Sequence, residues 1–187
     1  MALGLIIGLV VAAIVLIIVI AFIYYYNRFI VLENRIDNSL SQIDVQLKRR
    51  AELVPNLINT VKGYAKHEKG IMQEVVDARK VLLAAKDVKK RVEAGAELQN
   101  ALKSIFALAE NYPQLKANEN FLQLQQELAT IEDRIAYSRQ YYNDSILEYN
   151  NKVEVFPGMF FANLYSKKEK EYLKIPEEIR AVPKVEF

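Results

Sequence analysis

Residues 121–149 read FLQLQQELATIEDRIAYSRQYYNDSILEY, and their apolar and tyrosine side chains recur at alternating intervals of three and four. Such intervals place side chains on one face of an α-helix, whereas a strand would need an interval of two. The positions on this face are Phe121, Leu124, Leu128, Ile131, Ile135, Ser138, Tyr142, Ser145 and Tyr149. We expect Asn118 or Asn120 to cap the start of the helix, with Glu119 in its first turn. The stretch therefore predicts one long amphipathic helix.

The chain before this stretch is also predicted to be helical. Between residues 28 and 154 there are two prolines, Pro55 and Pro113, and three glycines, far fewer turn residues than a β-protein needs. The first helix is expected to continue through Pro55 with a kink. Its inward positions are predicted to be Ile36, Leu40, Ile43, Leu47, Ala51, Val54, Ile58 and Val61.

Two shorter helices are expected between the long ones. One is predicted over about 68–85, and the other over about 96–111, because Pro113 disfavours helix at the preceding residue. The polar stretch 86–95 is read as a break or a solvated helical link. The predicted fold class is therefore all-α: an N-terminal transmembrane helix that continues into an elongated antiparallel bundle of four helices, the first and last of them long.

Residues 3–26 read LGLIIGLVVAAIVLIIVIAFIYYY and contain no charge. A helix of 24 residues rises about 36 Å, enough to cross a hydrocarbon core of about 30 Å. A cleaved signal peptide would need a basic start, a shorter apolar run and small residues at its end. Here the run ends in Tyr24, Tyr25 and Tyr26, residues typical of a membrane interface. We expect an uncleaved anchor.

Basic residues near this run, beginning with Arg28 and Arg35, lie on its C-terminal side. The positive-inside rule then predicts a single-pass protein of the inner membrane, with its large C-terminal domain in the cytoplasm. An extracytoplasmic domain is the alternative. The basic cluster 48–50 is expected to be a solvated face or a contact between subunits, too far along the helix to meet lipid.

The composition argues against most catalytic chemistry. The chain has no Cys and a single histidine, His67, so zinc sites, di-iron sites and a thiol nucleophile lack their residues. It contains neither of the glycine-rich phosphate-binding patterns, and its net charge of +2 does not favour nucleic-acid binding. The carboxylates of the long helices are read as an outer stripe or as partners for Arg134 and Arg139. We expect no enzyme, no metal and no cofactor.

Four segments resemble the bacterial LemA family. They are RIDNSLSQIDVQLKRRAELVPNLINTVKGYAKHE at 35–68, AENYPQLKANENFLQLQQELATIEDRIAYSRQYYNDSILEYN at 109–150, VFPGMFFANLY at 155–165, and the terminal PKVEF. The resemblance implies a single-pass membrane protein with a bundle of long helices. It implies no activity, cofactor or catalytic residue. Some members of that family look like lipoproteins, which favours an extracytoplasmic domain, although this chain lacks the cysteine that lipidation needs.

Two groups of residues are candidates for interaction. The first is an aromatic cluster around Pro157 and Gly158, either packed back on the bundle as a cap or exposed for self-association or membrane contact. Its candidate surface consists of Phe156, Phe160, Phe161, Leu164 and Tyr165. The second is a possible ligand groove formed by Tyr137, Tyr141, Tyr142 and Tyr149. The final residues, with Val182, Val185 and Phe187, are expected to dock as an irregular strap.

The predicted organisation is an anchor (1–27), a helical bundle (28–154) and an aromatic, proline-containing tail (155–187). We expect a membrane-anchored scaffold or interaction protein of the bacterial cell envelope. Its expected partners are the lipid bilayer, further copies of itself and another membrane protein. The alternative is a sensory or accessory module that binds a small ligand or peptide and acts on a membrane protease or kinase.

Overall fold

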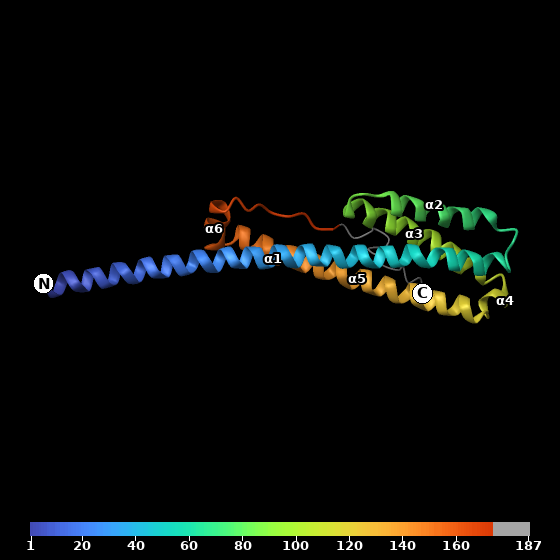
Figure 1. Ribbon diagram of the computed structural model, residues 1–187, viewed down its shortest axis with the longest axis horizontal. Coiled ribbons are helices and arrows are strands. Elements are labelled where there is room, and N and C mark those ends of the chain that lie inside the picture. The colour runs from blue at the N-terminus through green and yellow to red at the C-terminus, as the bar shows by residue number, and fades with distance from the viewer. Residues whose placement is uncertain (174–187) are drawn as a thin grey trace, which may run out of the picture. The chain divides into compact units, whose positions relative to one another are not determined.

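The computed structural model describes residues 1–173, which contain six helices and no strand (Figure 1). The all-α prediction is confirmed for this part of the chain. The helices are α1 (Ala2–Lys62), α2 (Lys69–Ala84), α3 (Val88–Ala109), α4 (Pro113–Lys116), α5 (Glu119–Glu154) and α6 (Gly158–Leu164). The strap expected of Val182, Val185 and Phe187 lies outside the described residues.

The helix boundaries differ from the expected ones in two ways. The four long helices are accompanied by two short ones, α4 and α6, so the expected number of four was too low. α3 begins at Val88, so the expected break between the second and third helices is confined to residues 85–87. Charged residues at 89–91 favour helix well enough to extend α3 backwards. α1 continues through Pro55, as expected.

The start of α5 is defined by a side-chain cap. Asn118 Oδ1 accepts a hydrogen bond of 3.0 Å from the backbone N–H of Phe121, three residues later. Glu119 occupies the first turn, where its charge suits the positive end of the helix dipole. Of the two asparagines considered as the cap, the structure selects Asn118.

The described chain divides into two compact units. Unit 1 comprises Met1–Asn38 and Tyr142–Tyr172, and unit 2 comprises Ser39–Tyr141 with Leu173. The boundary between the units falls at residues 38–39 within α1 and at residues 141–142 within α5, so both helices contribute residues to both units.

In unit 1, the second part of its α1 segment packs against the end of α5 and against α6. The buried side chains of this core include Phe29, Leu32, Ile36, Ile146, Tyr149, Phe161 and Ala162. The first part of α1 has no such cover. Its apolar side chains from Leu3 to Ile20 are exposed, and its most apolar window of 18 residues has a mean hydropathy of 3.5 with no residue buried. By length and composition, α1 can therefore cross a membrane.

In unit 2, α2 packs along α3. The rest of α1 contributes an apolar face at helical spacing, and six of its expected inward positions are fully or nearly fully buried: Ile43, Leu47, Ala51, Val54, Ile58 and Val61. Leu40 is half-buried. α3 and α5 supply the facing side chains, among them Leu98, Ile105, Phe121 and Ile135. Each large apolar side chain buried in this way contributes about 1.5–3 kcal/mol to stability.

Candidate functional site

α6 lies against the part of α1 where the apolar run ends. The ring of Phe161 stacks on the ring of Tyr25 with centroids 4.5 Å apart, and meets Phe22 edge-on at 5.2 Å. The hydroxyl of Tyr165 donates a hydrogen bond of 2.9 Å to the backbone carbonyl of Phe22. Tyr165 also meets the ring of Tyr26 edge-on, with centroids 5.4 Å apart. These contacts hold α6 beside residues 22–26 of α1.

The opposite side of this short segment is exposed and largely apolar, with Asn163 as its polar residue. Phe156 is 77% exposed, Phe160 60% and Leu164 53%. Val155 and Met159 extend the same exposed surface. Of the five predicted surface residues, three are thus exposed, whereas Phe161 is buried and Tyr165 is half-buried against α1. We call the exposed residues Phe156, Met159, Phe160 and Leu164 the outer face of α6.

The approach of α6 to α5 depends on a glycine. A Cβ placed on Gly158 would lie 2.2 Å from the backbone carbonyl oxygen of Lys152, which no real side chain tolerates. Gly158 begins α6 and is buried. The sequence therefore needs a residue without a Cβ at the one point where the start of α6 meets the end of α5.

Tyr149 lies at the centre of a polar network in unit 1. Its hydroxyl donates to Glu33 Oε1 over 3.3 Å, and its ring meets Phe29 edge-on at 5.8 Å. Lys167 Nζ donates to both oxygens of Glu33, at 2.9 and 2.8 Å. Burial, followed by the negative charge of Glu33 and the hydrogen bond to it, raises the pKa of Tyr149 to about 12. Tyr149 therefore stays protonated at neutral pH and acts as a hydrogen-bond donor.

The chain after α6 returns along α5 and is held there by an asparagine. Asn150 donates from Nδ2 to the carbonyl of Lys170 and accepts from the backbone N–H of Lys170, both at 2.9 Å. One side chain thus satisfies both backbone groups of one residue, as a neighbouring strand would. The hydroxyl of Tyr142 adds a bond of 3.4 Å to the carbonyl of Glu171. Within unit 1, these bonds fasten residues 170 and 171 to α5.

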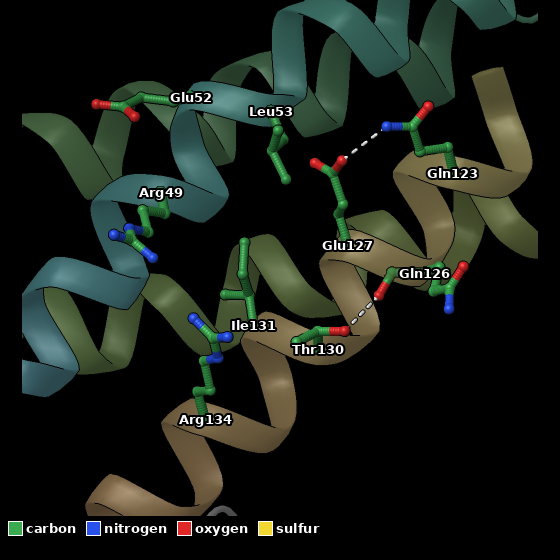
Figure 2. Close-up of a pocket in the computed structure, with 9 residues that line it drawn as sticks. All are labelled: Arg49, Glu52, Leu53, Gln123, Gln126, Glu127, Thr130, Ile131 and Arg134. Atoms are coloured by element: carbon green, nitrogen blue, oxygen red, sulfur yellow. Dashed lines mark hydrogen bonds between the residues drawn. The ribbon is translucent and has the colours of Figure 1, made fainter.

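Unit 2 contains a groove of about 510 Å³ between α1 and α5 (Figure 2). Leu53 and Ile131 form its apolar part, and charges of both signs surround them. The lining residues are Arg49, Glu52, Leu53, Gln123, Gln126, Glu127, Thr130, Ile131 and Arg134. Gln123 donates to Glu127 across one helical turn at 3.1 Å. A groove of this size and mixed charge suits a small zwitterionic ligand or a peptide segment.

Arg50 corrects the expectation that residues 48–50 form a solvated basic face or a subunit contact. Its side chain is 2% exposed, forms an ion pair with Glu132, and donates to the carbonyl of Gly95 over 3.2 Å. Burial, and then the nearby charge of Arg139, lower its pKa to about 10, so it stays charged at neutral pH. The sequence offered one signal, because Arg50 lies three residues after the core residue Leu47 and so shares its face.

Other carboxylates also have partners that spacing did not indicate. Asp44 forms ion pairs with Arg91 at 2.7 Å and with Lys48 at 2.8 Å, and Glu132 pairs with Arg50 rather than with Arg134 or Arg139. Glu148 pairs with Arg28 and, at 3.4 Å, with Arg35. Apart from Asp44 and Lys48, which are four residues apart in α1, these pairs join segments that lie far apart in the sequence, so helical periodicity alone could not reveal them.

The four tyrosines of the predicted ligand groove differ in exposure. Tyr142 and Tyr149 are 5% and 1% exposed and belong to the core of unit 1. Tyr137 and Tyr141 belong to unit 2 and are 71% and 42% exposed. Tyr137 lies beside Gln42 and Gln46 in a second groove of unit 2. The exposed pair lies at the surface of unit 2, while the buried pair serves packing and hydrogen bonding in unit 1.

The described residues hold no group of three or more His, Cys, Asp or Glu side chains that could bind a metal ion. Comparison with protein-family models matches residues 39–187 to the LemA family. The chain is 24% identical to magnetosome protein MamQ 2 of Paramagnetospirillum magneticum, with 80% of this chain and 64% of that protein covered. It is 25% identical to magnetosome protein MamQ of Magnetospirillum gryphiswaldense, with 79% and 64% covered.

Protein LemA of Metamycoplasma hominis is 28% identical, with 66% of this chain and 57% of that protein covered. The chain thus spans less than two thirds of the length of these relatives. None of these relatives is named for an enzymatic activity. The family match includes residues 39–62 of α1, all of α2 to α6, and Tyr149 and Asn150, but not Glu33, the partner of Tyr149. The resemblance noted from the sequence is confirmed, and the chain belongs to the LemA family.

Proposed function

We propose that this chain is a membrane-anchored helical scaffold of the bacterial cell envelope, without catalytic activity of its own. One observation carries the proposal: α1 is a single helix of 61 residues, apolar and exposed at its start and buried in a packed core at its end. A continuous helix of this kind holds the domain in a fixed position relative to the bilayer, because no flexible linker separates the two. The anchor is residues 1–27, followed by the bundle at 28–154 and the tail at 155–187.

We further propose that the four long helices form an antiparallel bundle. Within unit 2, Tyr64 of the chain just after α1 accepts a hydrogen bond from Asn118, and Arg50 meets Glu132. Moving back along α1 thus corresponds to moving forward along α5, as expected of antiparallel neighbours. The packing of α2 along α3 supports the second pair.

Self-association is the second part of the proposal, and the apolar half of α1 supports it. Gly4, Gly8 and Ala12 recur every four residues and share one helix face, the pattern that lets membrane helices approach closely. A Cβ on either glycine would meet nothing within 4 Å, so a neighbouring helix has room there. This association would bring copies together within the bilayer.

The mass of the detergent-solubilised full chain, measured by light scattering, tests self-association. We expect an oligomer that Gly4→Leu with Gly8→Leu dissociates, and that Ile6→Leu, a control in the same turn of helix, leaves intact. Removing residues 155–187 should lower the mass only by that of the deleted residues and leave the number of chains per oligomer unchanged, because the spans remain. A strict monomer in every form would refute self-association and leave the anchor proposal standing.

For orientation, we propose that the large domain faces the cytoplasm, on the basis of the basic residues that follow the span. Protease access in sealed vesicles of known sidedness tests this. Cleavage in unit 2 only from the cytoplasmic side supports the proposal, and cleavage only from the opposite side refutes it.

The groove of unit 2 supports the alternative of a sensory or accessory module. Arg49 and Arg134 could hold a carboxylate while Glu52 holds a cation, so a short zwitterionic peptide is the matching ligand class. Tyr137 and Tyr141 are exposed enough to extend such a site. Saturable binding of peptides to the full chain that Arg134→Ala weakens would support this function; equal binding to both proteins would exclude the groove.

A further inference from the structure

We propose that the outer face of α6 inserts into the interfacial layer of the same bilayer that α1 crosses, so that the chain holds the membrane at two points. The inference rests on the proposed membrane anchor and adds a second, in-plane element to it. Its occupant is lipid.

The contacts of α6 determine its depth. Phe161 stacks on Tyr25, and Tyr165 donates to the carbonyl of Phe22, so α6 lies level with residues 22–26 of α1. If the apolar run of 24 residues crosses a hydrocarbon core of about 30 Å, its last turn lies at the boundary between acyl chains and headgroups. α6 is therefore held at that boundary by its own packing.

The chemistry of the segment suits that location. Residues 155–166 carry no charge. Of their four aromatic residues, Phe161 and Tyr165 contact α1, while Phe156 and Phe160 face outwards. Aromatic rings are favoured at the membrane interface. The exposed Lys168 follows at once, and a lysine there can reach anionic headgroups.

Continuity with the span argues for lipid rather than for a soluble partner. Val19, Ile20 and Ile23 of α1 are themselves exposed and apolar, in the turns next to the residues that α6 covers. The exposed surface of the span and the outer face of α6 thus adjoin along α1. A bilayer that covers the exposed surface of the span therefore also reaches the outer face of α6, and no further component is needed.

The absence of tryptophan from the chain permits a direct test. Phe160→Trp introduces a single indole on the outer face, and Leu164→Trp provides a second position there. Tyr137→Trp is the matched control, because Tyr137 is an exposed aromatic residue of unit 2, at 71% against 60% for Phe160. Ile14→Trp reports on the span. Each full-length variant is reconstituted into vesicles of phosphatidylcholine with phosphatidylglycerol, and circular dichroism verifies that helix content is unchanged.

Lipids brominated either near the headgroup or near the end of the acyl chain then quench indoles by depth. We expect the shallow lipid to reduce the emission of Phe160→Trp and Leu164→Trp about twofold, with a blue-shifted maximum. Ile14→Trp should respond most to the deep lipid, and Tyr137→Trp to neither.

Two results would overturn the inference. If both outer-face variants behave like Tyr137→Trp while Ile14→Trp is quenched, the span holds but α6 does not enter the membrane. If the outer face is shielded only at high protein concentration and without lipid quenching, a second copy covers it instead. Failure of Ile14→Trp to respond would refute the membrane anchor itself, which separates the two proposals.

Discussion

The hydroxyl of Tyr165 donates a hydrogen bond to the backbone carbonyl of Phe22, a residue 143 positions earlier in the chain, over 2.9 Å. This bond joins the segment after α6 to the end of the apolar run in α1. Because the acceptor is a backbone carbonyl, the bond depends on the position of the helix and not on which side chain residue 22 carries. With the stack of Phe161 on Tyr25, it explains how a helix of seven residues keeps a defined place.

Gly158→Ala should detach α6 from α5. The new Cβ would lie 2.2 Å from the carbonyl oxygen of Lys152, and backbone must move to accept it. We expect a loss of about 2 kcal/mol in unfolding free energy, typical of overpacking, and faster proteolysis near Phe160. Thermal unfolding of the full chain in detergent measures the first effect. Gly70→Ala is the control, because its Cβ would meet nothing within 4 Å; an equal loss in both variants would contradict the prediction.

Arg50→Ala should destabilise unit 2 by about 3 kcal/mol, because it leaves Glu132 and the carbonyl of Gly95 without their partner. The adjacent Arg49→Ala should cost less than about 0.5 kcal/mol, since Arg49 is exposed. Chemical unfolding of both variants compares them. Replacing the pair together, as Arg50→Met with Glu132→Leu, should recover most of the loss. A double variant as unstable as Arg50→Ala would show that the ion pair is not the cause.

The ion pair between Lys167 and Glu33 should show measurable coupling in a double-mutant cycle. Both side chains are about four-fifths buried, at 19% and 22% exposure, and Lys167 Nζ contacts both carboxylate oxygens. We expect a coupling of about 1 kcal/mol from Lys167→Met and Glu33→Gln. Lys80 and Asp77 form a comparable pair with 65% and 55% exposure, and their cycle should show no measurable coupling. Equal coupling in both cycles would argue against a role for burial.

Tyr149→Phe should alter the alkaline stability of unit 1. The pKa of Tyr149 is raised from 10 to about 12, so the folded chain retains the phenolic proton where the unfolded chain releases it. This stabilisation is fully present below pH 10 and is lost as the pH rises through about 12. The wild type should therefore lose stability relative to Tyr149→Phe over that interval. Unfolding midpoints across the interval measure the difference, and Tyr137→Phe, at an exposed position, should follow the wild type.

Much of the fold could be predicted from local patterns. The seam through Phe121 and Ile135, the cap at Asn118 and the uninterrupted passage from the apolar run into α1 all appear as expected. Helical periodicity and the free energy of transferring side chains out of water are properties of neighbouring residues, so they can be evaluated along the chain. The short helices α4 and α6 could not be predicted in this way, because four or seven residues are too few to show a period.

The interaction surfaces could not be predicted from local patterns, because they depend on contacts between distant segments. Residues 156–165 are apolar or aromatic except for Asn163, and packing on Tyr25 and Phe22 separates the inward Phe161 from the outward Phe160. From the sequence, Arg50 is expected at the surface, whereas in the structure it is buried and contacts Glu132 and the carbonyl of Gly95. Local sequence determined which residues are helical and which stretch is apolar enough for a membrane. The partners of each side chain followed from the register between helices, which depends on packing across the whole chain at once.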